Sequence, residues 1–122
     1  MLLRHSTPKR NLPGIVRHGL LYGKSQGRLK AVWLHSPART VWATLHVVKW
    51  HGGRVEDVVT LEIEVPRSWL KRNRRGAWYV ARDIPFDHVR RIVTFAEVGG
   101  GVIAQSARRN PSATRTKPMP SA

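Results

Sequence analysis

The chain of 122 residues contains no cysteine. This absence excludes disulfide bonds, zinc sites with cysteine ligands and catalysis by a thiol. Long apolar runs are also missing, because none approaches the ~18–20 residues that a membrane-spanning helix needs. The first residues, Met1–His5, lack the apolar stretch of a secretion signal. We therefore expect a cytoplasmic protein with no membrane segment.

Acidic residues are absent from the first 55 positions, which carry ten Lys or Arg. All seven acids fall between Glu56 and Glu97, and the formal net charge is +15. Such one-sided charge predicts an anionic partner: nucleic acid, a phosphorylated cofactor or an acidic surface. The alternative is a charge that serves solubility, or a proteome biased toward arginine.

Composition divides the chain into two parts. Residues 105–122 are rich in Ser, Ala, Pro, Arg and Lys, with Met119 as their one large apolar side chain. Such a segment cannot bury enough apolar surface to offset the entropy of ordering it. The rest holds all five tryptophans and enough apolar residues for one core. We predict a single domain over residues 1–104 and a disordered basic tail over 105–122.

Hydrophobic periodicity and turn residues predict an α+β fold with a small mixed or antiparallel sheet. The expected elements are a strand at 2–3, a helix at 7–19, a strand at 31–35, a helix at 36–51, a strand at 58–65, a short helix or turn at 66–70, and strands at 77–82 and 91–98. Pro13 is awkward inside the first helix, so that helix is either kinked or begins at Pro13. Gly19 is its expected end.

The second helix is expected to bury one apolar stripe, and Trp42 with it. The stripe has helical spacing and consists of Ala38, Val41, Trp42, Leu45 and Val48. In the strand at 58–65, the alternation predicts buried Val59, Leu61, Ile63 and Val65, with Glu62 and Glu64 on the exposed face.

The six histidines do not indicate a metal site. No two of them stand at the i, i+4 spacing that presents two ligands on one helical face, and no carboxylate accompanies them. The dinucleotide motif GxGxxG and the phosphate motif GxxxxGK[ST] are also absent.

The densest run of cations follows the short helix. Its members are Arg67, Lys71, Arg72, Arg74 and Arg75. Trp69 and Trp78 flank this run, and cations beside aromatic rings are typical of surfaces that bind single-stranded nucleic acid. The alternative is a solvated loop without a ligand.

Several short stretches occur in a distinctive order: Leu3–Pro8, Leu12–Leu21, Val32–Pro37, Leu61–Val65, Trp78–Pro85 and Arg91–Val93. In this order they resemble the ADP-ribosyltransferase-like superfamily, which includes the RNA 2'-phosphotransferases. Those proteins open with a strand ending in Tyr-His-Gly-Thr, a helix closing with Ile-Leu-x-x-Gly-Leu, and a strand leading into Ser-Pro. The resemblance spans residues 2–95 and implies a split two-sheet core with two main helices and a short third.

The resemblance also implies a site. His5 takes the place of the early histidine, which contacts the ribose of NAD or a phosphate, and Thr7 that of the motif threonine. Trp33 stands where relatives have a tyrosine that stacks on nicotinamide. The motif glycine is replaced by Ser6, which puts close backbone approach of a ligand in doubt.

No counterpart of the late catalytic glutamate lies near Arg82, which disfavours transfer of ADP-ribose to a protein side chain. RNA 2'-phosphotransferases dispense with that glutamate and hold phosphate with Arg and His. Candidates for such a cluster are Arg4, His5, Arg17, His18, His35 and Arg82.

Among these residues, the resemblance makes His5 and Arg82 the catalytic pair. Arg4, Thr7, Trp33 and His35 become cofactor-binding residues, with NAD as the candidate cofactor. The expected function is binding of NAD or RNA phosphate by a transferase or a degenerate relative. A non-enzymatic nucleic-acid-binding module is the alternative, and a protein-interaction domain a third. The sequence does not indicate an oligomeric state.

Overall fold

The computed structural model describes residues 1–25 and 28–97. The predicted basic tail and the last residue of the final predicted strand lie outside these ranges. Within them, two three-stranded antiparallel sheets and two helices confirm the α+β expectation.

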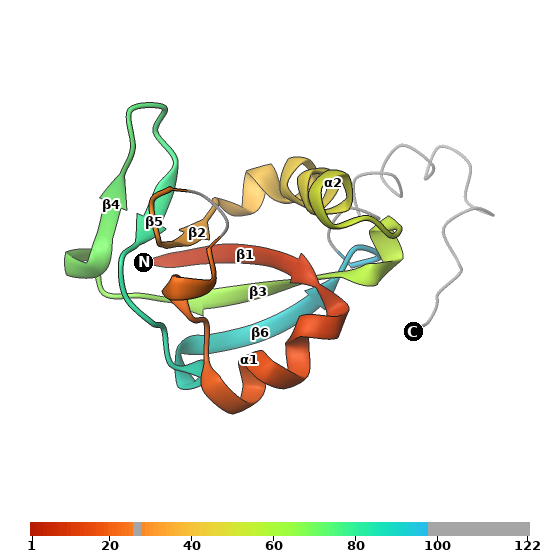
Figure 1. Cartoon of the computed structure of the whole chain (residues 1–122), viewed down its shortest axis with the longest axis horizontal. Coiled ribbons are helices and arrows are strands. Elements are labelled where there is room, and N and C mark those ends of the chain that lie inside the picture. The colour runs from red at the N-terminus through yellow and green to blue at the C-terminus, as the bar shows by residue number, and fades with distance from the viewer. Residues whose placement is uncertain (26–27, 98–122) are drawn as a thin grey trace.

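The larger sheet has the order β1-β3-β6, with β1 at Leu2–Pro8, β3 at Val58–Glu64 and β6 at Val89–Thr94. The smaller sheet has the order β2-β5-β4, with β2 at Val32–Leu34, β5 at Trp78–Val80 and β4 at Leu70–Arg72. Figure 1 shows the smaller sheet at one end of the larger one. The central strand β3 is buried at Val58, Val59, Thr60, Leu61 and Ile63, so residues on both of its faces are covered and not only the alternating apolar ones.

The two helices lie on opposite sides of the larger sheet in Figure 1. Helix α1 spans Leu12–His18 and α2 spans Thr40–His51. The expected short helix after β3 is a single 3-10 turn at Arg67–Trp69. The core between the sheets contains side chains from both, among them Leu3, Leu61, Ile63, Val80 and Ile84, each at most 1% exposed.

The first helix begins later than position 7. Thr7 and Pro8 are still in β1, where they pair with Val59 and Val58. Pairing with β3 therefore outweighs the local sequence preference for a helix at Thr7 and Pro8. Pro13 falls in the first turn of α1, where a backbone N–H has no helical partner and its absence costs nothing. Gly19 ends this helix as expected.

Other strand limits also differ from expectation. Lys71 and Arg72 belong to β4, which pairs with β5, and not to the predicted loop. Strand β5 is shorter than predicted, and β6 begins two residues earlier than the expected Arg91.

The stripe predicted for α2 is wrong. The helix buries Thr40, Ala43, Thr44 and Val47 against the sheet, whereas Trp42 is 56% exposed. The predicted stripe contained neither of these threonines. In the structure the Thr44 hydroxyl donates to the Thr40 carbonyl at 2.9 Å, so it is buried without an unmet hydrogen bond.

Arg4 joins the two sheets. Its backbone exchanges two 2.8 Å hydrogen bonds with His35, which directly follows β2. Its guanidinium donates to the Glu62 carboxylate at 2.5 and 3.0 Å and to the Thr40 hydroxyl at 3.0 Å. Glu62 was expected on an exposed face, but its side chain is only 12% exposed, because Arg4 and Arg91 hold its two oxygens.

We predict that Glu62→Ala lowers the free energy of unfolding by about 3–5 kcal/mol, because it leaves the Arg4 guanidinium buried without its counter-charge. Urea denaturation measures the loss. Glu64→Ala is the matched control, since Glu64 is 45% exposed and pairs with the N-terminal amine, and it should cost less than about 1 kcal/mol. Equal losses for the two variants would contradict this account of the junction.

A second prediction concerns Gly19, whose φ is 79°. A Cβ at this position would lie 2.5 Å from the Ile84 carbonyl oxygen. Gly19→Ala should therefore destabilise the fold by more than about 2 kcal/mol, through backbone strain and this collision. Gly14→Ala is the control, because a Cβ there meets nothing within 4 Å, and it should stabilise α1 by about 0.5–1 kcal/mol. Thermal unfolding of both variants checks the contrast.

Candidate functional site

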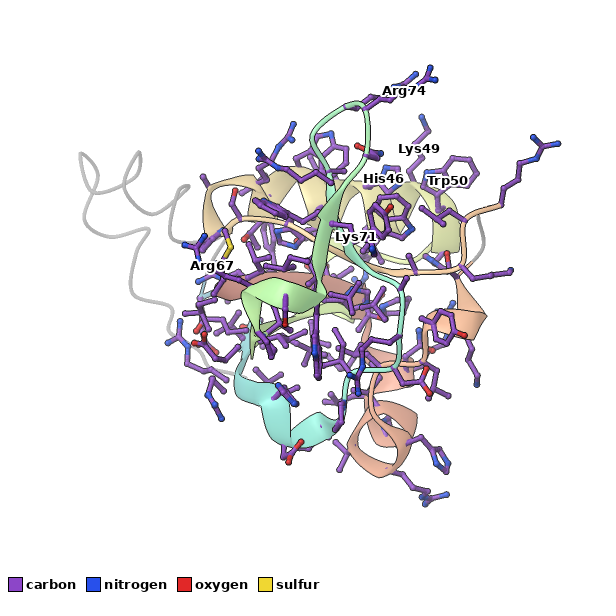
Figure 2. All side chains as sticks on the ribbon, turned by 90° about the vertical axis from the view of Figure 1, so that its left-hand side faces the viewer. His46, Lys49, Trp50, Arg67, Lys71 and Arg74 are labelled. Carbon is purple, nitrogen blue, oxygen red and sulfur yellow. The ribbon has the colours of Figure 1, made fainter. Side chains whose placement is uncertain are left out.

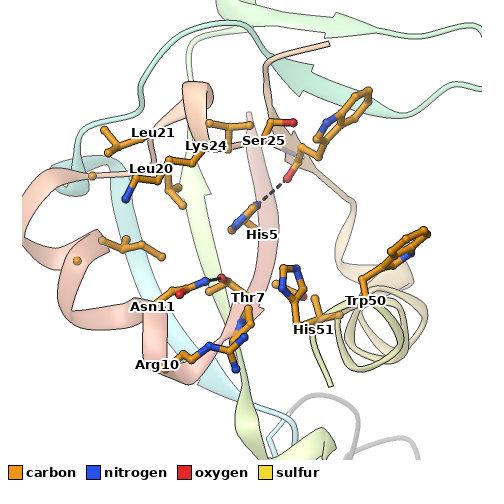
Figure 3. Close-up of a pocket in the computed structure, with 18 of the residues that line it drawn as sticks. His5, Thr7, Arg10, Asn11, Leu20, Leu21, Lys24, Ser25, Trp50 and His51 are labelled. Atoms are coloured by element: carbon orange, nitrogen blue, oxygen red, sulfur yellow. Dashed lines mark hydrogen bonds between the residues drawn. The ribbon is translucent and has the colours of Figure 1, made fainter. Parts of the chain in front are cut away.

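An open groove of about 970 Å³ lies among β1, α1, the segment after α1, β2 and the C-terminal half of α2 (Figure 3). The polar, charged and aromatic residues that line it are His5, Ser6, Thr7, Arg10, Asn11, His18, Lys24, Ser25, Trp33, His46, Trp50 and His51. Its floor includes the apolar residues Ile15, Leu20 and Val32. A volume of this size is in the range typical of small-ligand pockets.

The groove carries positive charge without any compensating acid on its walls. Arg10 and Lys24 line it together with four of the histidines, and its described lining contains no Asp or Glu. Every lining residue comes from positions 5–51, which belong to the acid-free first half of the chain. The fold thus gathers this one-sided charge around a concave surface, which favours an anionic ligand.

His5 points into the groove from β1 (Figure 3). Its Nδ1 lies 2.7 Å from the Trp33 carbonyl oxygen. Since a carbonyl only accepts, Nδ1 carries the proton and Nε2 keeps a free lone pair. Burial lowers the pKa of His5, while the bond to Trp33 partly opposes this shift. The imidazole is therefore neutral near pH 7 and can accept a proton or a hydrogen bond at Nε2.

His35 lies behind the groove in a polar chain. Its Nδ1 is 2.9 Å from the Ser36 carbonyl, and its Nε2 is 3.1 Å from the Ser6 hydroxyl. The Ser6 hydroxyl in turn lies 2.9 Å from that of Thr60. Burial lowers the pKa of His35 to about 4, the bond to the Ser36 carbonyl partly opposes this shift, and the charges of Arg4 and Arg39 act in the same direction as burial. This chain fixes Ser6 and therefore the strand that presents His5.

Two more of the residues expected in the site lie at the groove. Trp33 lines it, and its ring packs against Tyr79 with centroids 5.1 Å apart. Thr7 lies at the floor, where its hydroxyl accepts a 3.0 Å hydrogen bond from the Asn11 amide. His5, Thr7 and Trp33 thus line one groove.

Arg4 and Arg82 lie elsewhere. The Arg4 guanidinium is buried against Glu62 and Thr40, where it supports the sheet junction. Arg82 is exposed, and its guanidinium lies 3.7 Å from the centroid of the Trp69 ring. The structure therefore does not bring Arg82 to His5. His18 lines the groove, whereas Arg17 does not.

The five cations of the basic run surround the β4–β5 hairpin. Figure 2 shows Arg74 at its tip and Arg67 at its base. All five are exposed, and in the part of the chain that the structure describes none of them forms an ion pair. The Arg72 guanidinium lies 4.1 Å from the Trp78 ring centroid.

Several groove residues were missed from the sequence. Arg10, Asn11, Lys24, His46, Trp50 and His51 belong to no motif in the sequence. The usable signal was the absence of acids, which marks the half of the chain that folds around the groove. The path of residues 19–25 decides which cations of this half come together at the groove. Two backbone hydrogen bonds between Leu20 and Ile84 fix that path.

Among the described residues, no three His, Cys, Asp or Glu side chains stand close enough to hold a metal ion. None of the described helices has the length and apolarity to cross a bilayer.

The pKa of His35 predicts a pH-dependent stability. The unfolded chain takes up a proton at His35 near pH 6.5, whereas the folded chain resists it until about pH 4. The free energy of unfolding should therefore fall by about 2–3 kcal/mol as the pH drops through this window, so the folded state becomes less stable. His35→Asn keeps a donor toward the Ser36 carbonyl and should flatten the slope between these values. Urea denaturation at several pH values measures it, and an unchanged slope would refute the assignment to His35.

No protein-family model matches the chain, and no curated protein matches it either. Among solved structures, the crystal structure of protein CC0527 from Caulobacter crescentus, a structural genomics target, is similar with a TM-score of 0.53 and 18% sequence identity. The match covers 77% of this chain and 85% of CC0527. At this identity the likeness concerns the fold: the chain shares its α+β architecture with CC0527.

Proposed function

We propose that the groove binds a phosphate-bearing nucleotide ligand, either NAD or an RNA phosphate. The observation that carries this proposal is the acid-free lining, which unites cations, a neutral histidine and a tryptophan on one concave surface. Arg10 and Lys24 supply charge for phosphate, and Trp33, which also lines the groove, is the candidate to stack on a base or nicotinamide.

His5 is the proposed acid–base group of any transfer reaction. Its free Nε2 can accept a proton from an attacking hydroxyl, and the Trp33 carbonyl holds the ring in that tautomer. Because no carboxylate lines the described groove, there is no group to stabilise the oxocarbenium-like charge of ADP-ribosyl transfer. Phosphate handling, as in the RNA 2'-phosphotransferases that the sequence resembles, fits these residues better.

Titration with NAD and with a short 2'-phosphorylated RNA tests the proposal. Two-dimensional NMR and calorimetry detect the binding. Arg10→Ala and Lys24→Ala should each weaken binding about tenfold, the usual effect of removing a charged hydrogen-bond donor. Arg17→Ala is the matched control, since Arg17 is an exposed cation of α1 that does not line the groove.

His5→Asn separates binding from turnover. Asparagine can still donate to the Trp33 carbonyl but lacks the Nε2 acceptor, so binding should persist while any transfer is lost. The absence of binding to either ligand, or equal weakening by Arg17→Ala and Arg10→Ala, would rule out the groove as the site.

A second function is favoured by the exposed cations of the β4–β5 hairpin, which lack acidic partners among the described residues. In this alternative the chain is a non-enzymatic module that binds nucleic acid through Arg67, Lys71, Arg72, Arg74 and Arg75. Binding would then fall steeply with salt. It would also survive Arg10→Ala and Lys24→Ala but not neutralisation of the hairpin.

A further inference from the structure

Helix α2 presents a row of aromatic rings to solvent. Trp42, His46 and Trp50 follow one another at intervals of four residues, so they lie on one side of the helix. The Trp42 and His46 rings stack with centroids 5.1 Å apart and planes within 18°. The His46 and Trp50 rings are 5.9 Å apart and tilted. We call these three residues the aromatic ladder.

The ladder is exposed although its residues are large. Trp42 is 56% and Trp50 62% exposed, and the buried face of α2 is complete without them. Exposed aromatic surface of this extent normally marks an interaction site. The Trp42 and His46 rings stack, the Trp50 ring lies beside them, and none of the three is buried in the core, so they form a preordered surface for flat ligands.

The charge around the ladder identifies the kind of partner. The Arg39 guanidinium lies 5.3 Å from the Trp42 ring centroid, and Lys49 is exposed on the same helix. The sequence of α2 contains no Asp or Glu. Aromatic rings among unopposed cations fit a ligand that combines flat bases with phosphates, as single-stranded nucleic acid does.

The ladder is continuous with the groove. His46 and Trp50 line the groove, whereas Trp42 lies outside it, toward the start of α2. Trp42 and Trp50 are eight positions apart, which is a rise of about 12 Å along the helix and the length of roughly three to four stacked nucleotides. A strand with its phosphate end in the groove could therefore lay its next bases along the ladder.

We propose that the aromatic ladder binds the unpaired bases of a single-stranded nucleic acid whose phosphate end occupies the groove. This inference rests on the proposed function of the groove and extends it from a nucleotide to a strand. The bases stack on Trp42 and Trp50, while Arg39 and Lys49 pair with the backbone phosphates. The ladder contacts the flat faces of the bases and not the hydrogen-bonding groups at their edges, so it accepts any base sequence.

The test measures anisotropy of fluorescein-labelled RNA and DNA of about ten nucleotides, within the usual site size for single strands. The full chain is compared with Trp42→Ala, and with Leu45→Ala as the matched control. Leu45 is 53% exposed on the same helix but outside the ladder. Trp42→Ala should weaken oligonucleotide binding about tenfold, and Leu45→Ala less than about twofold. The RNA and DNA arms show whether the ribose hydroxyl contributes.

Two further variants isolate the ring. Trp42→Phe should restore most of the affinity because it keeps an aromatic face, whereas Trp42→Leu should not, because it keeps only apolar area. Circular dichroism verifies that each variant folds. If Trp42→Leu binds as well as Trp42→Phe, the contact is not base stacking and the proposal is overturned.

The proposal for the ladder and the proposal for the groove can be refuted separately. Because Trp42 does not line the groove, Trp42→Ala should leave binding of NAD and of a mononucleotide unchanged. If NAD or a mononucleotide binds normally but Trp42→Ala does not change oligonucleotide affinity, the ladder proposal alone is refuted. If neither small ligand binds, the proposed function of the groove is refuted. Two other results would also overturn the ladder proposal: Trp42-dependent binding to equimolar phosphatidylcholine–phosphatidylglycerol vesicles without oligonucleotide binding, and Trp42-dependent dimerisation in sedimentation equilibrium.

Discussion

The contacts of Arg4 decide how the two sheets meet. Its backbone pairs with His35 at the end of β2, and its guanidinium reaches Glu62 on β3 and Thr40 at the start of α2. One residue thus ties the larger sheet, the smaller sheet and a helix together. The groove opens beside this junction, so its shape depends on a buried ion pair that takes no part in its walls.

The surroundings of the groove show a division between charge that supports the fold and charge that lines the groove. Glu62 is neutralised by Arg4 and Arg91 behind β1, while Arg10 and Lys24 have no acid beside them on the groove walls. Attraction for an anion is therefore not cancelled by neighbours. The half-buried, neutral His35 behind the wall holds Ser6 by a hydrogen bond and adds no charge of its own to the groove.

Much of the fold could be predicted, because strand alternation and turn residues are local signals. The strand at β3, the end of α1 at Gly19 and the two-helix α+β class follow from them. The buried face of α2 could not be predicted, because hydrophobicity favours Trp42 over Thr44, and only the fit against β1 and β3 selects small side chains. For the site, the family resemblance placed His5, Thr7 and Trp33 together. It did not reveal that Arg82 stacks on Trp69, since that contact depends on the paths of the segments flanking β4 and β5.

The small buried face of α2 has a consequence for how this protein can change over time. Thr40, Ala43, Thr44 and Val47 hold the helix to the sheet, and Trp42 and Trp50 contribute nothing to that packing. Packing against the sheet and the recognition proposed for the aromatic ladder thus use different sides of one helix. Mutations on the outer side can alter the preferred partner at little cost in stability, so related chains can diverge in specificity while they keep the same architecture.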